Sequence, residues 1–411
     1  MSVSHKDEIP CVNGWRSVAD FLALRRNTSL LLVALVLAGT GERLWLGFAP
    51  KYLQTLGAGV LIIGLFDALQ TLLGAVYAYP GGWLTDRWGQ RRSLFFFNAL
   101  SLAGYAIVLA WQHWLALVLG VFLFLAWSAL SLPATFSAIA TSLDKRRHTM
   151  GVGVQSMIRR IPMMVGPFVG GWLITRCGWE DGVRFALLGC IVLSAATALF
   201  QWSMTESPKE ESAAPEKAPS SISFLGVVKS FNPTLRELLV SDILIRFCER
   251  LPYAFVILWA MNHGGVSAKD FGVLTAIEMV TAMLCYIPVA HLADKHGQRP
   301  FVLATFVFFT LFPVTLLWAD TFAWLAVAFV VRGLKEFGEP ARKALIIAQA
   351  RPELRARTYG AYYLIRDCIV TTGSFVGAWL WSVSPQANFI GAAVCGGLGT
   401  IWFWRLVQRR G

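Results

Sequence analysis

Charged residues are scarce in this chain. Only 15% of its 411 residues are Asp, Glu, Lys or Arg, whereas soluble domains carry roughly 25%. Hydrophobic residues make up 56% and include 28 Phe and 17 Trp. A soluble domain of this length has no core large enough to bury so much apolar mass. The composition therefore argues against a soluble helical protein and predicts an all-α integral membrane protein.

Motifs for catalysis and for metal binding are also missing. The seven cysteines show no Cys-x-x-Cys spacing, and the six histidines lie mostly at loops or span ends, so we expect no metal site. The chain has no Gly-x-Ser-x-Gly, His-Glu-x-x-His or Walker sequence, which argues against an enzyme and against ATP hydrolysis. We expect no cofactor and, from the polar first 27 residues, no signal peptide.

Long apolar runs occupy most of the sequence. A spanning helix needs about 20 apolar residues. Twelve spans are predicted, at 28–50, 58–82, 93–110, 114–138, 150–175, 183–203, 238–261, 270–293, 300–318, 322–350, 358–382 and 388–405. The polar stretch after the sixth span predicts a linker. The predicted organisation is an amino-terminal segment (1–27), a six-helix bundle (28–203), a linker (204–237), a second six-helix bundle (238–405) and a tail (406–411).

Basic residues set the expected orientation. Most Lys and Arg outside the spans fall on the side that holds both termini, and the opposite side holds Lys51, Arg176, Arg184 and Lys269. This asymmetry predicts a multi-pass protein of the bacterial inner membrane with both termini in the cytoplasm. Basic loops against anionic headgroups also account for the net charge of +12 without a nucleic-acid partner.

The two halves repeat one another in sequence. GERLWLGF, which begins at Gly41, recurs as CERLPYAF from Cys248, and IRRIPMMVGPFVGGWL recurs as IRDCIVTTGSFVGAWL. Each repeat holds an even number of spans, so the halves share one orientation and are related by an axis along the membrane normal. Such an arrangement is typical of a carrier whose site lies between two bundles.

The loop after the second span resembles a family signature. GGWLTDRWGQRR is similar to the G-x-x-x-D-R/K-x-G-R/K-R/K signature of the major facilitator superfamily, with Gln90 as a departure, and a partial second copy has Ala290 for the leading glycine. The resemblance covers the whole chain and implies the fold of that family and a conformational latch. The latch residues are Gly82, Asp86, Arg87, Gly89 and Arg91, with Asp294, Lys295, Gly297 and Arg299 in the second copy.

A second pattern lies in the predicted fifth span. Antiporters of that superfamily carry G-x8-G-x3-G-P-x-x-G-G there, and this chain is similar at Gly153, Gly166, Pro167, Gly170 and Gly171, with Pro162 in place of the second glycine. The resemblance implies proton-driven export. Ordinary glycine packing between membrane helices is the alternative reading.

Charged side chains inside the spans are the candidate site. A charge at the bilayer centre costs roughly 2.5–3.5 kcal/mol on the insertion scale, so these groups should face the protein interior or water. The candidates for proton coupling and the substrate cavity are Glu42, Arg43, Asp67, Arg159, Arg160, Glu249, Arg250, Glu278, Arg332, Glu336, Arg366 and Asp367. Adjacent helical residues do not face each other. We therefore expect Glu42 to pair with Arg159 or Arg160, and Glu249 to pair with Arg366.

These observations predict a monomeric secondary transporter. Glu42 and Glu249 are the first candidates for carrying protons, and arginines would hold a small anionic or zwitterionic substrate. Alternating access with proton antiport and export is the favoured mechanism. A symporter or facilitator for an organic anion, a lysolipid flippase and a non-transporting membrane sensor remain alternatives. The sequence does not name the substrate.

Overall fold

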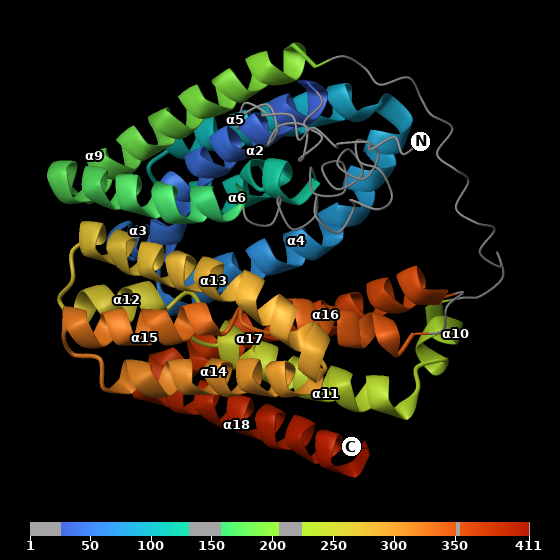
Figure 1. Ribbon diagram of the computed structural model, residues 1–411. Coiled ribbons are helices and arrows are strands. Elements are labelled where there is room, and N and C mark those ends of the chain that lie inside the picture. The colour runs from blue at the N-terminus through green and yellow to red at the C-terminus, as the bar shows by residue number, and fades with distance from the viewer. Residues whose placement is uncertain (1–25, 131–157, 205–223, 351–353, 411) are drawn as a thin grey trace, which may run out of the picture.

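The computed structural model describes residues 26–130, 158–204, 224–350 and 354–410, and in these ranges every regular element is a helix. Two helical bundles lie one above the other (Figure 1). The amino-terminal bundle contains α2 (Arg26–Trp45), η1 (Leu46–Phe48), α3 (Ala49–Thr55), α4 (Val60–Trp88), α5 (Gln90–Ala110), α6 (Trp114–Phe124) and α9 (Arg160–Trp202). The carboxy-terminal bundle contains α10 (Phe224–Lys229), α11 (Pro233–Arg250), α12 (Val256–Asn262), α13 (Ala268–His296), α14 (Arg299–Leu317), α15 (Phe322–Leu334), α16 (Glu339–Ala348), α17 (Arg355–Val383) and α18 (Pro385–Arg410).

The helices match the predicted spans. Within the described residues, six helices are long and apolar enough to cross a membrane, among them the 43-residue α9. Helix α9 contains residues 160–175 of the fifth predicted span and nearly all of the sixth, and the two parts turn back on each other at Gly178 (φ 82°). Large apolar side chains such as Leu199 (71% exposed), Leu284 (71%) and Trp379 (61%) lie on the outer surface. Exposure of this kind suits contact with lipid.

The carboxy-terminal bundle begins earlier than predicted. Helix α10 and the first turn of α11 lie inside the expected linker (204–237). Helix α11 begins at Pro233 because Asn232 caps it: the Asn232 side chain accepts a hydrogen bond from Leu235 N at 2.7 Å. Helix α18 likewise continues to Arg410, through most of the predicted tail.

Three predicted spans are interrupted. The first breaks near its end at η1, which contains Gly47, the seventh at residues 251–255 around Pro252, and the tenth at residues 335–338 before Pro340. Proline removes a backbone donor and glycine weakens a helix, so both favour such breaks. The breaks in α2–α3 and α11–α12 fall at corresponding places in the sequence repeat.

The bundles touch through α9 with α13 and through α4 with α17. Glycine makes these contacts possible. A Cβ on Gly171 would lie 2.2 Å from the carbonyl oxygen of Ala268, and one on Gly272 would lie 2.4 Å from that of Pro167. These contacts lie toward the end of the molecule away from the described termini of the chain, which are the start of α2 and the end of α18 (Figure 1).

Candidate functional site: a charged cavity between the bundles

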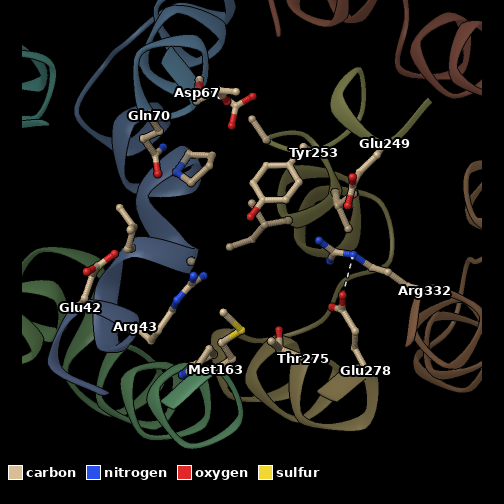
Figure 2. Close-up of a pocket in the computed structure, with 18 of the residues that line it drawn as sticks. Glu42, Arg43, Asp67, Gln70, Met163, Glu249, Tyr253, Thr275, Glu278 and Arg332 are labelled. Atoms are coloured by element: carbon tan, nitrogen blue, oxygen red, sulfur yellow. Dashed lines mark hydrogen bonds and ion pairs between the residues drawn. The ribbon is translucent and has the colours of Figure 1, made fainter. Parts of the chain in front are cut away.

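A cavity of about 550 Å³ lies between the two bundles. Its walls come from α2 and α4 on one side and from α11, α13 and α15 on the other, with α9 below (Figure 2). Eight of the predicted site residues and one further basic residue, Lys335, line it; the eight are Glu42, Arg43, Asp67, Glu249, Arg250, Glu278, Arg332 and Glu336. The volume suits a small-molecule ligand, since such pockets measure roughly 300–1,000 Å³.

Asp67 connects the bundles across one wall. Its carboxylate lies 3.0 Å from the Arg250 guanidinium and accepts a hydrogen bond from Ser374 at 2.7 Å. Arg250 also donates to the Asp67 carbonyl oxygen at 2.8 Å and contacts the Thr71 hydroxyl. Asp67 is only 3% exposed. The buried pair therefore ties α4 to α11 and α17.

A chain of ion pairs covers the opposite wall. Lys335 Nζ lies 2.7 Å from Glu249, whose second oxygen accepts from Arg246 at 2.7 Å. Glu278 lies 3.2 Å from Arg332 and 3.9 Å from Lys335. Glu249 and Glu278 thus each have two cationic neighbours, and they share Lys335. Such pairing offsets the cost of burying charge.

The Tyr253 ring lies between two guanidinium groups on this wall. The Arg250 guanidinium carbon is 4.7 Å from the ring centroid and that of Arg332 is 5.8 Å away. These cation–π contacts hold the ring in place. Figure 2 shows Tyr253 extending into the cavity from the α11 side.

The expected pair of Glu249 with Arg366 is not formed. Arg366 instead lies 3.4 Å from Asp242 and 2.7 Å from Asp367, and neither Arg366 nor Asp367 lines the cavity. Asp242 is fully buried and also binds Arg342 at 2.5 Å. Arg366 thus has Asp242 within reach. The Glu249 carboxylate is already paired with Lys335 and Arg246.

The expected pair of Glu42 with Arg160 is also absent. Arg160 crosses to the other bundle and lies 3.1 Å from Glu336. The charges of Arg43 and Arg159 act on the Glu42 carboxylate, but the alternative ion pair with Arg159 is not formed within 4.0 Å either. Neither Glu42 nor Arg43 makes an ion pair within 4.0 Å with a residue of the described ranges. Glu42 and Arg43 extend from neighbouring positions of α2 beside the cavity (Figure 2).

The candidate site residues did not include three members of these networks: Asp242, Arg246 and Lys335. Asp242 lies two turns and Arg246 one turn before Glu249 on α11, and both were detectable as further charges inside a predicted span. Spacings of four and three residues place Arg246 on the Glu249 side of the helix. Lys335 belongs to the charged stretch of the tenth span and was recognisable in the same way.

The latch residues lie at the end of the molecule that carries the termini. Gly89 and Gly297 have φ of 84° and 83°, a backbone conformation that glycine adopts without strain. Arg87 lies 5.3 Å from the Trp83 ring and Arg91 lies 5.3 Å from the Trp202 ring. Gly82 lies in the last turns of α4, Lys295 in the last turn of α13 and Arg299 at the start of α14. The side chains of Asp86 and Asp294 fall outside the described residues.

The glycines of the antiporter-like pattern allow close packing of α9. A Cβ on Gly166 would lie 2.5 Å from Arg43 Cβ, and one on Gly170 would lie 1.7 Å from the Leu44 carbonyl oxygen. Pro167 sits inside the helix at the cavity wall. Gly153 lies outside the described residues. This packing holds α2, with Glu42 and Arg43, against α9.

Comparison with known proteins gives consistent matches. The model of the Major Facilitator Superfamily matches residues 31–261 and 238–411. An uncharacterised MFS-type transporter of Methanocaldococcus jannaschii is 24% identical over 62% of this chain, and the match spans 65% of that protein. A homologue of the multi-drug resistance efflux pump PmrA from Lactococcus lactis subsp. lactis is 23% identical over 92% of this chain and 94% of its own length.

A solved structure has the same fold. The crystal structure of a mutant of the nucleoside transporter NupG superposes with a TM-score of 0.74 at 12% identity, covering 93% of this chain and 100% of that one. The predicted all-α membrane fold of two pseudo-symmetric helical bundles is thereby confirmed. With two bundles enclosing a charged cavity and both halves of the sequence matched, this chain belongs to the Major Facilitator Superfamily of membrane transporters.

Proposed function

We propose that this transporter exports a small zwitterionic or anionic solute in exchange for protons, by alternating access. The observation that supports this most directly is that Glu42 and Arg43 lack close ionic partners among the described residues. Both border the cavity, yet neither makes an ion pair within 4.0 Å with a residue of the described ranges, while the facing wall is internally paired. An acid and a base side by side can bind the two charged ends of a zwitterion.

Alternating access is supported by where the bundles meet. Lys51 Nζ lies 2.5 Å from Asn262 Oδ1, and Lys269 N donates to the Thr175 hydroxyl at 3.0 Å. Both contacts join the two bundles at the end away from the termini. If the termini are cytoplasmic, as the basic residues predict, this conformation is closed to the outside. Transport then requires these contacts to part while the opposite ends of the bundles approach.

Glu42 is a better proton acceptor than Glu249 on geometric grounds. Glu249 contacts two cations at 2.7 Å, so a proton would have to displace both. Glu42 is 4% exposed and has only more distant basic neighbours. A proton on Glu42 would remove the charge that holds the cationic end of a zwitterion. Proton binding and substrate binding would then compete, which is the requirement for antiport.

The Asp67–Arg250 pair favours a second candidate, symport of an organic anion. A proton on Asp67 would weaken its 3.0 Å contact with Arg250 and leave that guanidinium available to an anionic solute. Proton and anion would then bind together. The same pair ties the two bundles, so its release would also favour opening toward the other side.

Proteoliposomes that contain a pH-sensitive dye would separate the two candidates. Amino acids, dipeptides and dicarboxylates would be added singly, and solute-driven proton movement and its direction would be recorded. For antiport, Glu42→Gln, which resembles the protonated side chain, abolishes solute-driven proton movement and weakens binding of a zwitterion. Arg43→Gln weakens solute binding more than Arg43→Lys does. Asp181→Asn is the control, because the Asp181 side chain is 64% exposed and pairs with Arg184 outside the cavity.

Each result assigns the mechanism. Loss of coupling in Asp67→Asn with normal coupling in Glu42→Gln would favour symport over antiport. Normal coupling in both variants would remove both carboxylates from the proton pathway. The proposal also includes a monomer in the bacterial inner membrane with both termini in the cytoplasm, which accessibility of tags at either terminus would test.

A further inference from the structure

A second pocket, separate from the central cavity, lies where α5 begins and α9 ends. It has a volume of about 350 Å³ and is lined by Arg91, Arg92, Phe95, Gln201 and Trp202. The pocket is at the end of the molecule that carries the termini, on the outer side of the amino-terminal bundle. Phe95 is 41% exposed and Trp202 is 68% exposed, so its rim is apolar as well as basic.

The aromatic residues hold one arginine over the pocket. The Arg91 guanidinium carbon lies 5.3 Å from the centroid of the Trp202 ring, and the Phe95 ring meets the Trp202 ring edge-on at 6.3 Å. Tryptophan at a span end marks the level of the lipid headgroups. The Arg91 side chain is thus fixed at headgroup level with its N–H donors available for bidentate recognition.

Gln201 supplies an independent sign that the pocket takes a polar ligand. Its side chain is 0% exposed, yet neither its amide nitrogen nor its amide oxygen has a hydrogen-bond partner among the described residues. Buried polar groups are nearly always paired, because an unpaired one loses its hydration without compensation. An unpaired buried amide that borders a pocket is explained if a ligand atom completes it.

The charge around the pocket selects an anion. The lining within the described residues contains two arginines and no carboxylate. The pocket also adjoins the first turn of the 21-residue helix α5, whose N-cap, Gly89, provides no side-chain cap. Backbone N–H groups at such an end carry partial positive charge and favour anions.

We propose that this pocket binds the phosphate group of an acidic phospholipid from the leaflet on the side of the termini. Arg91 would bind the phosphate oxygens, and the Gln201 amide would donate to one of them. Trp202 and Phe95 would contact the glycerol and the first acyl carbons, since their exposed faces extend the pocket toward lipid. A lipid rather than a soluble phosphate is favoured because the site is open through apolar side chains at headgroup level.

Native mass spectrometry of the purified full chain would test this proposal. The probes are dioctanoyl phosphatidylglycerol, dioctanoyl phosphatidylcholine and inorganic phosphate. Arg91→Gln and Gln201→Leu should each weaken phosphatidylglycerol binding on the order of fivefold to tenfold, the loss typical of one charge-assisted or buried hydrogen bond. Arg176→Gln is the matched control, because the Arg176 guanidinium carbon also lies over an exposed tryptophan, 5.7 Å from the Trp172 ring centroid, but beside the turn at Gly178 in the middle of α9.

The outcomes are distinct. Selective loss of phosphatidylglycerol in Arg91→Gln and Gln201→Leu, with Arg176→Gln unchanged, supports the site. Equal retention of phosphatidylcholine, or competition by inorganic phosphate at similar concentration, would overturn the assignment to an acidic lipid. Unchanged phosphatidylglycerol binding in Arg91→Gln would overturn it as well. The Arg91→Gln variant alone still tests the proposal if Gln201→Leu unfolds. None of these results depends on the transport assay.

Discussion

Substitution of Gly171 by alanine would penalise the conformation seen here. A Cβ at this position would lie 2.2 Å from the Ala268 carbonyl oxygen, whereas ordinary contacts begin near 3.4 Å, so α9 and α13 would have to separate by about 1.2 Å. Overpacking of this kind costs typically about 1–3 kcal/mol. The contact joins the two bundles, so the strain falls on the state that is closed at the end away from the termini.

The expected consequence is a shift of population toward the opposite state. A penalty of about 1–3 kcal/mol changes an equilibrium by roughly 5- to 150-fold. The measurement is the rate at which a membrane-impermeant maleimide, added on the side away from the termini, labels a cysteine placed at Thr275 in the cavity wall. The other cysteines would be replaced, and labelling should accelerate by a factor in that range.

Gly74 offers a matched control for this substitution. Gly74 lies in a helix, as Gly171 does, and lines the cavity, but a Cβ there meets nothing within 4 Å. Gly74→Ala should leave the labelling rate at the wild-type value. An unchanged rate in Gly171→Ala, or an equal acceleration in both variants, would refute the reasoning that α9–α13 contact closes this side.

Two further substitutions should lower the free energy of unfolding. Asp242→Asn leaves the buried guanidinium groups of Arg342 and Arg366 without their shared carboxylate, and breaking a buried pair costs about 3–5 kcal/mol; a Tm in detergent equal to that of the wild type would contradict this. Gly89→Ala places alanine at φ 84° and ψ 160°, a region essentially restricted to glycine, which costs about 1–3 kcal/mol. Gly74→Ala serves as its control, and equal Tm values for both alanine variants would show that the backbone conformation at Gly89 imposes no strain.

The fold was predictable because each feature that specifies it is contained in a short stretch of sequence. A run of about 20 apolar residues must form a helix in lipid, whatever surrounds it, because its backbone groups have no other partners. The repeat of the Glu42 segment at Glu249 then specifies two related bundles. Buried charge likewise placed candidate site residues on the first, second, fifth, seventh, eighth, tenth and eleventh spans, since such groups have to avoid lipid. The candidate charges of the fifth and eleventh spans do not line the cavity.

The partner of each charge was not predictable in the same way. Helical spacing tells which face a side chain occupies, but a pair between helices depends on their relative height and rotation. Arg366 was expected at Glu249, and packing of α17 places it at Asp242 instead. It also reaches the adjacent Asp367 at 2.7 Å, because the long guanidinium side chain folds back past its neighbour.

The sequence by itself therefore determined the helices, their repeat and the chemical types that face inward, because these follow from local solvation in a bilayer. Only the tertiary structure decided which charges are satisfied. It left Glu42 and Arg43 without close ionic partners in the described ranges, since Arg160 was drawn across to Glu336 by the approach of the two bundles. Pairing is a property of distances between helices, and those distances are set by packing of the whole molecule.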